Sequence, residues 1–547
     1  MNPTLNALVT ATAAVLASPA QSATDAQLRA IAEQRLQGDR TGACFAVAVI
    51  DGGVSRAYVC ADAAKAGRID ANTAFEIGSV SKTMTAALLA DLIGQGKGSL
   101  DDPLSAWLPE GTRVPEFQGQ PILLRHVVSH TSGLPALPPG VPIVDPNDPY
   151  AAVDVTMLFA ALERSTLDAA PGTAFAYSNF ASMLLSEAVA RRAGTDFESL
   201  LAERIFTPLG MRGAYVNTRP EGIRAAVGHL PNGKPTPPWN FKTDLAGVGG
   251  VRATLDDMVR YVQAQLGQPP LPIVSALALS QQPVVPDGQP PMAMNWMLDD
   301  INGHTWHAHE GGTGGFSSLV AFDRERGRGV VVLSDTALHS LGGLGSLGLH
   351  LADASQPLGK PRKAVPAPGE LIDALVGEYT LQGGMAMALS RDGDALAIQA
   401  TGQPRFKMGY DDAGDFYPLD FDALLKPQPK ADGSHGFTWL QMGGAVAAVR
   451  TDGATKPALP MPAPGQLARY AGDYPLMPGF VLKVFVKDGA LHIQGTGQPA
   501  LPTTVVAADV FAVDQVGAEF RFERNDAGDV TAVTLLQGGQ TLRGEKQ

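Results

Sequence analysis

A serine and a lysine three residues apart, Ser79 and Lys82, are the first residues in this 547-residue sequence whose types and spacing suit chemistry. They lie where an extended segment gives way to a helical pattern, so both side chains fall on one helical face. A serine hydroxyl needs an adjacent base to become a nucleophile, and a desolvated, neutral lysine can be that base. Free N–H groups at a helix start also suit a developing oxyanion. The pair therefore predicts a nucleophile with its base.

The stretch Tyr177-Ser178-Asn179 is the first candidate partner for this pair. In an extended segment, residues 177 and 179 point to the same side, so a phenol and an amide would face one cavity. A phenolate stabilised by Lys82 can relay protons to a leaving group, and the amide can hold the lysine or the substrate carbonyl. The alternative interpretation is a buried tyrosine and a turn asparagine.

The glycine-rich segment after His309 is the second candidate. A glycine-rich strand end lets a substrate lie against the backbone, and the N–H of Gly312 can complete an oxyanion hole with the N–H of Ser79. His309 would then face the cavity. The alternative is a surface histidine beside a glycine-rich turn.

Together these elements resemble the serine β-lactamase and penicillin-binding-protein superfamily, in its class C-like branch of peptidases and esterases. The resemblance covers about residues 30–352 and rests on motifs that occur in the family's order. They are Ser79-Val80-Ser81-Lys82 (Ser-x-x-Lys), the segment from His126 to Pro135 (His-Thr-Ser-Gly-Leu-Pro), Tyr177-Ser178-Asn179 (Tyr-x-Asn), Ile205-Phe206-Thr207-Pro208-Leu209-Gly210-Met211 and Gly249-Gly250-Val251-Arg252-Ala253-Thr254.

This resemblance implies an α/β fold in which an antiparallel sheet flanked by helices is joined to a helical subdomain, with the site in the cleft between them. It also implies acyl-enzyme chemistry without a metal or an organic cofactor. Ser79 would attack a carbonyl while Lys82 and Tyr177 share the proton transfers, and which of the two is the acylation base stays open. The N–H groups of Ser79 and Gly312 would form the oxyanion hole, and Asn179 would orient the substrate.

One departure from the family bears on the substrate. The family's third motif is usually Lys-Thr-Gly, whose lysine helps to hold a substrate carboxylate, whereas this chain has His309-Glu310-Gly311. A neutral histidine attracts a carboxylate less than an ammonium does, and Glu310 would repel it. His-x-Gly at this position resembles the D-aminopeptidase and esterase-like members. We therefore expect the three residues to bind substrate, with Glu310 receiving an α-ammonium group; the alternative for Glu310 is an outward-pointing strand residue.

The composition changes after the α/β segment, which we place at residues 24–355. Residues 356–369 form a proline-rich linker, and residues 370–456 and 457–547 read as two copies of a small antiparallel β-barrel. Gly377-Glu378-Tyr379 recurs as Gly472-Asp473-Tyr474, and the run from Ala395 to Pro404 recurs from Ala490 to Pro499. A barrel loop could cap the cleft and limit substrate size; the alternative is a spacer or partner-binding module.

Residues 1–23 resemble an export signal, because a short apolar run precedes small residues, although no Lys or Arg precedes the run. Cys44 and Cys60 flank two β-rich runs joined by a three-residue loop, which places them opposite each other. We favour a disulfide and a periplasmic or secreted location, the alternative being two buried free thiols. No later apolar run approaches the length of a membrane span. The net charge of −13, without a basic stripe, argues against nucleic-acid binding.

The leading functional hypothesis is a serine peptidase that acts on small peptides, in the manner of D-aminopeptidases. A carboxylesterase is an alternative, because the same acyl-enzyme machinery accepts esters, and a weak β-lactamase is another. A different class also stays open, namely a penicillin-binding or wall-sensing protein that is acylated but turns over slowly. In every case the expected partner is a small molecule or a short peptide, and the sequence does not specify an oligomeric state.

Overall fold

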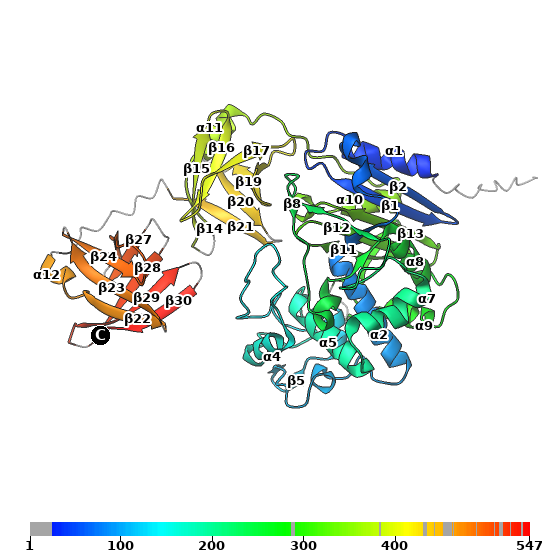
Figure 1. Ribbon diagram of the computed structural model, residues 1–547, viewed down its shortest axis with the longest axis horizontal. Coiled ribbons are helices and arrows are strands. Elements are labelled where there is room, and N and C mark those ends of the chain that lie inside the picture. The colour runs from blue at the N-terminus through cyan, green and yellow to red at the C-terminus, as the bar shows by residue number, and fades with distance from the viewer. Residues whose placement is uncertain are drawn as a thin grey trace, which may run out of the picture.

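The computed structural model describes the chain from Thr24 to its end at Gln547, with internal gaps (Figure 1). The described residues are 24–285, 290–381, 384–429, 435–441, 444–451, 462, 464–477, 479–487, 489–507, 509–513, 518–525, 527–537 and 540–547. The predicted export signal, residues 1–23, lies outside them. Among the helices in these ranges, none is both long and apolar enough to cross a bilayer.

A six-stranded antiparallel sheet organises the first part of the chain, which we call the α/β domain. Its strand order is β10 (Met297–Ile301), β11 (His304–Gly312), β12 (Ser317–Asp323), β13 (Arg328–Ser334), β1 (Cys44–Asp51) and β2 (Val54–Cys60). Since β1 pairs with β13, strands from the two ends of the domain's sequence lie side by side in the sheet. Cys44 and Cys60 are directly opposite in the β1–β2 register, and their sulfur atoms are bonded.

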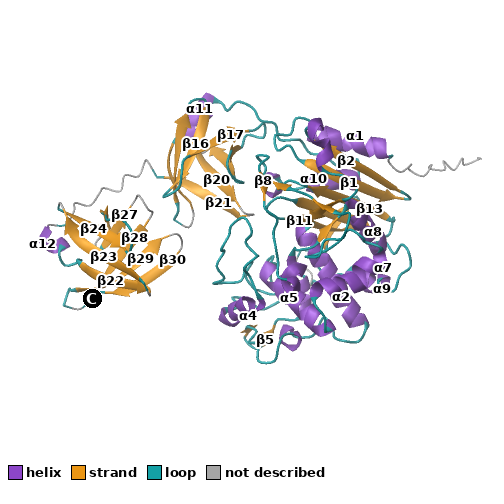
Figure 2. Cartoon of the chain, in the orientation of Figure 1, coloured by secondary structure: helices purple, strands orange, loops and turns teal. Residues whose placement is uncertain are grey.

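Helices cover both faces of this sheet (Figures 1 and 2). One face packs against α1 (Asp25–Leu36) and α10 (Gly345–Ala352), and the other packs against α8 (Leu255–Gln265) and the helical subdomain. Alternate residues of β1 enter two different cores: Phe45 and Val47 face α1 and α10, whereas Ala46 and Ala48 face the other side. Both faces of the strand are therefore buried, which gives β1 a continuous apolar run.

The helical subdomain surrounds α2 (Ser81–Gly94), whose side chains are buried on nearly every side. It contains α3 (Leu124–Val128), α4 (Val155–Arg164), α5 (Asn179–Ala193), α6 (Phe197–Leu201), α7 (Thr207–Leu209) and α9 (Val274–Ser280). Short strands complete it, namely β3 (Thr73–Glu76), β4 (Glu116–Phe117), β5 (Gln120–Pro121), β6 (Arg224–Ala225) and β9 (Arg252–Ala253). The hairpin of β7 (Gly228–His229) and β8 (Pro235–Thr236) lies instead against the end of the sheet, where the His229 N–H donates to the Asp335 carbonyl at 2.9 Å. The predicted combination of a helix-flanked antiparallel sheet with a helical subdomain is confirmed.

After α11 (Gly369–Leu375) the chain forms a closed antiparallel barrel, which we call barrel 1. Its strands are β14 (Gly377–Leu381), β15 (Ala386–Asp392), β16 (Ala395–Ala400), β17 (Phe406–Tyr410), β18 (Phe416–Pro418), β19 (Leu424–Pro429), β20 (His435–Gln441) and β21 (Gly444–Arg450). The interior is filled by alternating apolar side chains, so the barrel is a packed core.

The rest of the chain forms a second β unit of two sheets behind the short helix α12 (Pro464–Leu467). The sheets comprise β22 (Gly472–Met477), β23 (Phe480–Lys487), β24 (Ala490–Gly495) and β25 (Leu501–Pro502), then β26 (Thr504–Ala507), β27 (Val510–Val513), β28 (Ala518–Arg524), β29 (Val530–Gln537) and β30 (Gln540–Glu545). Its first and last strands, β22 and β30, lie side by side. The unit is therefore a nearly closed barrel.

The two β units repeat individual hydrogen bonds as well as sequence. The Tyr379 hydroxyl donates to the carbonyl four residues earlier at 2.9 Å, and the Tyr474 hydroxyl does the same at 2.7 Å. The Gln399 amide donates to the carbonyl four residues later at 3.1 Å, and the Gln494 amide does so at 3.0 Å. Equivalent residues therefore make equivalent hydrogen bonds in the two β units.

A buried ion-pair network docks barrel 1 onto the α/β domain. The Arg40 guanidinium donates to Asp411 at 3.1 Å and lies 3.4 Å from the centroid of the Tyr417 ring. Arg362, in the linker, donates to Asp411 at 3.0 Å and to Asp415 at 2.7 Å. The side chains of Arg40 and Asp411 are 3% and 0% exposed. Charges this deeply buried require their partners, so the linker and barrel 1 are held against the domain.

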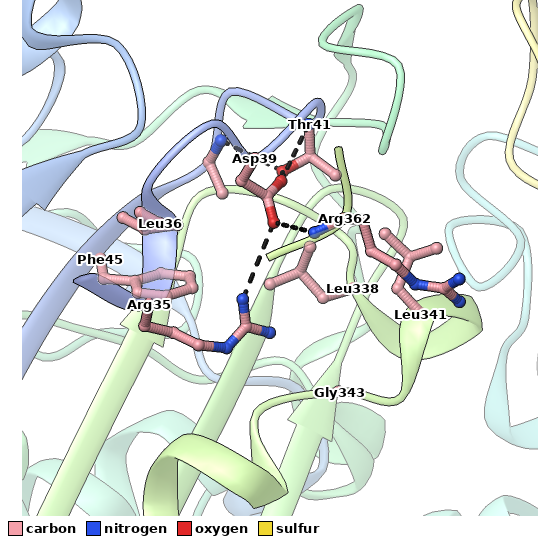
Figure 3. Close-up of a pocket in the computed structure, with 10 residues that line it drawn as sticks. Arg35, Leu36, Asp39, Thr41, Phe45, Leu338, Leu341, Gly343 and Arg362 are labelled. Carbon is pink, nitrogen blue, oxygen red and sulfur yellow. Dashed lines mark hydrogen bonds and ion pairs between the residues drawn. The ribbon is translucent and has the colours of Figure 1, made fainter. Parts of the chain in front are cut away.

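The same linker closes a small pocket against α1 (Figure 3). There Asp39 accepts the backbone N–H of Arg362 at 3.1 Å and the hydroxyl of Thr41 at 2.6 Å, and it lies 3.7 Å from the Arg35 guanidinium. None of the predicted catalytic or substrate-binding residues lines this pocket. It belongs to the packing of the linker on the domain.

Replacing Asp411 with alanine should loosen barrel 1. The substitution leaves Arg40 and Arg362 without their shared carboxylate, and breaking a buried ion pair in this way costs about 3–5 kcal/mol. Calorimetry should show a lower melting temperature, and limited proteolysis should show faster cleavage in the linker.

The matched control is Asp373→Ala, which removes the partner of Arg391 from an ion pair that is 38% and 68% exposed. An exposed pair contributes about 0–1 kcal/mol, so this variant should resemble the unsubstituted protein. Equal, small effects of the two substitutions would show that the network does not hold barrel 1.

Candidate active site

Ser79 lies in a single 3₁₀ turn, Gly78–Val80, between β3 and α2. Gly78 adopts φ 49°, a left-handed conformation, and a Cβ atom there would lie 2.6 Å from the backbone nitrogen of Gly312. Only glycine meets both conditions. The turn that carries Ser79 therefore touches the end of β11 backbone to backbone.

Gly311 secures the same contact from the strand side. A Cβ atom on Gly311 would lie 2.0 Å from the carbonyl oxygen of Ile77, and the Ser318 hydroxyl donates to that oxygen at 2.7 Å. The backbones at 77–79 and 311–312 are thus held together by close approach and by a side-chain hydrogen bond. An oxyanion hole formed by the N–H groups of Ser79 and Gly312 requires these two backbone segments to lie close together.

Lys82 is buried one helical turn after Ser79, as the sequence predicts. Its Nζ lies 2.9 Å from the Ser79 Oγ and donates to the carbonyl of Val248 at 2.6 Å. The side chain is 0% exposed, and desolvation moves the lysine pKa well below its ordinary value. The amine is therefore biased towards its neutral form, which can accept a proton from the serine.

Tyr177 approaches the same pair from the segment before α5. The residue is 38% exposed, but desolvation of the phenol raises its pKa above the ordinary value, although a hydrogen bond with Ser79 opposes the rise. The Lys82 Nζ lies 5.0 Å from the ring centroid. The structure thus brings Ser79, Lys82 and Tyr177 together, with the phenol protonated at neutral pH.

Asn179 departs from the predicted extended conformation. Ser178 is the N-cap of α5, and its hydroxyl accepts the N–H of Ala181 at 2.9 Å, so Asn179 is already the first helical residue. The Asn179 amide donates to the Tyr150 hydroxyl at 3.2 Å. Its Oδ1 is buried, and no partner for it occurs among the described residues. Asn179 lies next to Tyr177 but contacts Tyr150, which the sequence analysis did not single out.

His309 faces the helical subdomain from β11 and is 6% exposed. Its Nδ1 donates to the backbone oxygen of Glu310 at 2.6 Å, which leaves Nε2 as an acceptor. Burial, followed by the charge of Lys82, lowers the His309 pKa to about 4. At neutral pH this side chain offers no positive charge to a substrate carboxylate.

Glu310 points to the opposite face of the sheet. Side chains alternate along a strand, and the neighbouring Trp306 on the Glu310 face belongs to the core under α1 and α10. A Cβ atom on Gly343 would lie 2.5 Å from a Glu310 carboxylate oxygen, and one on Gly345 would lie 2.8 Å from the other. Burial raises the Glu310 pKa, while the N–H of Leu344 opposes the rise. The structure does not bring Glu310 to Ser79.

Barrel 1 reaches the site indirectly. A Cβ atom on Gly312 would lie 3.0 Å from the His339 imidazole, so His339 packs on the strand end beside Ser79. The next residue, Ser340, donates its hydroxyl to Asp422 of barrel 1 at 2.8 Å. The barrel loop between β18 and β19 therefore contacts the turn that carries His339.

Known proteins match a large part of this chain. The Beta-lactamase family matches residues 28–340. The D-alanyl-D-alanine-carboxypeptidase/endopeptidase AmpH of Escherichia coli (strain K12) is 34% identical over 224 residues, which cover 41% of this chain and 57% of that protein. A Beta-lactamase of the same strain is 28% identical over 370 residues, which cover 60% of this chain and 92% of that protein. The chain thus spans little more than half of the first relative.

A solved structure is also similar, the Beta-lactamase/D-alanine Carboxypeptidase from Yersinia pestis complexed with citrate. It is 23% identical with a TM-score of 0.46, and the match covers 56% of this chain and 92% of that chain.

The depressed pKa of His309 should make folding stability depend on pH. The unfolded chain, with a histidine pKa near 6.5, binds more protons than the folded chain between pH 6.5 and about 4. The free energy of unfolding should therefore fall as the pH drops through this window, by about 3 kcal/mol from this residue. Urea unfolding followed by tryptophan fluorescence at several pH values measures the loss.

The comparison is with His309→Gln, which should lose that much less stability over the same pH range. His307, whose pKa is also lowered, contributes equally to both curves and cancels in the difference. The charge of His309 helps to lower the His130 pKa, so the difference also includes that part of the His130 shift, which has the same sign. Parallel curves for the two proteins would contradict the prediction.

Proposed function

The chain belongs to the Beta-lactamase family, and on that premise we propose that it is a serine hydrolase that forms an acyl-enzyme at Ser79. The observation that carries the proposal is the wholly buried Lys82 amine, 2.9 Å from the Ser79 hydroxyl. A neutral amine in contact with a serine hydroxyl is the activated nucleophile that acyl transfer requires.

The opposite pKa shifts of Lys82 and Tyr177 support the following proton transfers in acylation. Ser79 Oγ attacks the substrate carbonyl carbon, and its proton passes to Lys82, whose lowered pKa keeps the amine unprotonated at rest. Tyr177, whose pKa is raised, gives its phenol proton to the leaving group as the carbon–heteroatom bond breaks. The Lys82 ammonium then returns a proton to the phenolate. In this account Lys82 is the base and Tyr177 is the acid.

The acyl-enzyme is released by water through the reverse set of transfers. The N–H groups of Ser79 and Gly312 would stabilise the oxyanion in both steps, since donors fixed in a water-poor site are worth several kcal/mol. Tyr177 passes its proton to Lys82, a water molecule attacks the ester carbon and gives a proton to the phenolate, and the Lys82 ammonium gives its proton to Ser79 Oγ as the ester C–O bond breaks.

For the substrate we propose short peptides, acted on by a peptidase. The support is the family and the similarity to a relative described as a carboxypeptidase/endopeptidase. Selection for a free amino terminus, as in D-aminopeptidases, would need an anion near Ser79, and Glu310 lies on the far face of β11. A weak β-lactamase and a slowly turning-over penicillin-binding protein are outcomes of the substrate test below.

A carboxylesterase is the second candidate, and His309 favours it. With a pKa of about 4, His309 is neutral where the family's lysine would be charged, so the end of β11 has no fixed cation for a substrate carboxylate. Substrates without a terminal charge, such as simple esters, do not need this cation, so its absence does not weaken their binding.

We also propose that the protein is exported. A disulfide between Cys44 and Cys60 persists in an oxidising compartment such as the periplasm. Thiol counting on protein isolated under alkylating conditions tests the proposal: no free thiol is expected, and two free thiols would argue against export.

Turnover should depend on Ser79, Lys82 and Tyr177 to graded extents. Ser79→Ala and Lys82→Met should reduce turnover to background, and Tyr177→Phe should lower kcat by about 10²–10⁴-fold because it removes the proton donor. The substrates are D- and L-aminoacyl p-nitroanilides, short peptide anilides, p-nitrophenyl esters and nitrocefin.

Tyr58→Phe is the matched control, because it removes a buried hydroxyl that has no partner among the described residues, from a strand remote from the site. It should leave kcat unchanged. Hydrolysis that survives Ser79→Ala would reject the proposed function. One equivalent of product released in a burst, without further turnover, would identify the slowly deacylating binder instead.

Glu310→Gln should leave selectivity for amino termini unchanged. Since the carboxylate lies beside Gly343 and Gly345, away from Ser79, the ratio of kcat/KM for aminoacyl anilides over their N-acetylated counterparts should stay within about twofold of the original. Both steady-state constants and the melting temperature are measured. A fall of tenfold or more in that ratio, with a normal melting temperature, would place Glu310 in contact with substrate.

A further inference from the structure

His130 accepts hydrogen bonds from the residues on either side of Tyr177 in the sequence, and its ring contacts the Tyr177 ring. The backbone N–H of Ala176 donates to the His130 carbonyl oxygen at 2.7 Å, and the backbone N–H of Ser178 donates to its Nδ1 at 3.3 Å. Between these two hydrogen bonds, the Tyr177 ring lies on the imidazole with 4.2 Å between ring centroids and a 31° tilt. The three contacts fix the two peptide groups that flank Tyr177 and the ring itself.

The backbone of His130 is adapted to this task. It adopts φ 56°, the left-handed region that a residue with a side chain rarely enters, and the residue is 0% exposed. Such a conformation persists only where the surroundings enforce it. Here it lets the carbonyl group and the side chain of one residue reach two amides that are two positions apart.

The hydrogen bond from Ser178 also fixes the state of the imidazole. Because Nδ1 accepts a hydrogen bond from the Ser178 N–H, the ring is neutral and carries its hydrogen on Nε2. The titratable groups that face the ring are Lys82 and His309, together with Tyr177. Burial, then the charges of Lys82 and His309, lower the His130 pKa well below its ordinary value. A protonated ring would turn Nδ1 into a donor and lose the bond to Ser178.

We propose that His130 is a positioning residue for the reaction: it places the Tyr177 phenol within reach of Ser79. The proposal rests on the proposed function, because it assumes that Tyr177 gives a proton to the leaving group. Proton transfer requires heavy atoms within hydrogen-bond distance, and a displacement of about 1 Å can cost 10²-fold in rate. We call the three contacts of His130 with residues 176–178 the clamp. Loss of the clamp should therefore lower kcat and leave KM nearly unchanged.

Two substitutions separate the contacts that His130 makes, and a third is the control. His130→Phe keeps a ring against Tyr177 but removes the acceptor for Ser178. His130→Asn keeps a side-chain acceptor near the Nδ1 position and tolerates the left-handed backbone, but it removes the ring. His126→Phe is the matched control: His126 Nδ1 likewise accepts a backbone N–H in the same segment, from Leu123 at 3.1 Å, but its ring packs on Gly172.

The assay measures kcat and KM for an aminoacyl p-nitroanilide, whose leaving amine must be protonated, the labelling rate of Ser79 by a fluorophosphonate, and the melting temperature. We expect His130→Phe to lower kcat about 10²-fold, His130→Asn to recover it to within about tenfold of the original, and His126→Phe to leave it unchanged. In the Tyr177→Phe background, His130→Phe should cause no further loss, because the phenol it positions is already absent.

The double variant decides between positioning and general support of the fold. If His130→Phe lowers kcat by the same factor with and without the Tyr177 hydroxyl, the positioning role is wrong, and an unchanged kcat in His130→Phe has the same meaning. If Tyr177→Phe itself keeps full activity, the phenol is not the proton donor and the positioning role is wrong, whereas the proposed function fails only if hydrolysis survives Ser79→Ala. Should His130→Phe not fold, the same double-variant comparison is made with His130→Asn, whose smaller loss should also vanish in the Tyr177→Phe background.

Discussion

The contact between a dehydrated lysine amine and a serine hydroxyl is the interaction on which the rest of the structure depends. A buried ammonium without a carboxylate partner is costly, and the least costly response is to lose the proton. The packing of α2 against its neighbours removes water from Lys82, and the carbonyl of Val248 takes one of its hydrogen bonds. Burial in the folded protein thus keeps the Lys82 amine unprotonated next to Ser79. The pKa of the Tyr177 phenol is shifted in the opposite direction, so the phenol stays protonated.

A second constraint connects this pair to the sheet. Gly78 and Gly311 permit backbone contact between the turn of Ser79 and the end of β11, where any side chain would collide. That contact joins a segment near residue 78 to one near residue 312, so the site exists only when the whole α/β domain is closed. Barrel 1 is then fixed to this domain through Arg40 and Asp411, and its Asp422 contacts the turn of His339 beside the site.

The sequence predicts local features well and the directions of side chains less well. The hairpin that pairs Cys44 with Cys60 follows from loop length, and the barrels follow from a repeat that conserves even hydrogen bonds. The sequence predicts an extended segment through Asn179, whereas the Ser178 cap makes Asn179 the first residue of α5. Strand alternation alone could have shown that His309 and Glu310 cannot face the same cavity. The contacts of His130 with Tyr177 depend on a left-handed backbone, which no residue spacing reveals.

A direct measurement of the ionisation of Lys82 tests the central claim. Protein labelled with ¹³C at the lysine Cε can be titrated by NMR, with Lys82→Met supplying the assignment. We predict one resonance whose midpoint lies well below the ordinary lysine value of about 10.4 and which disappears in the variant. A Lys82 resonance that titrates at the ordinary lysine value would show that the amine is charged at neutral pH and is not the base.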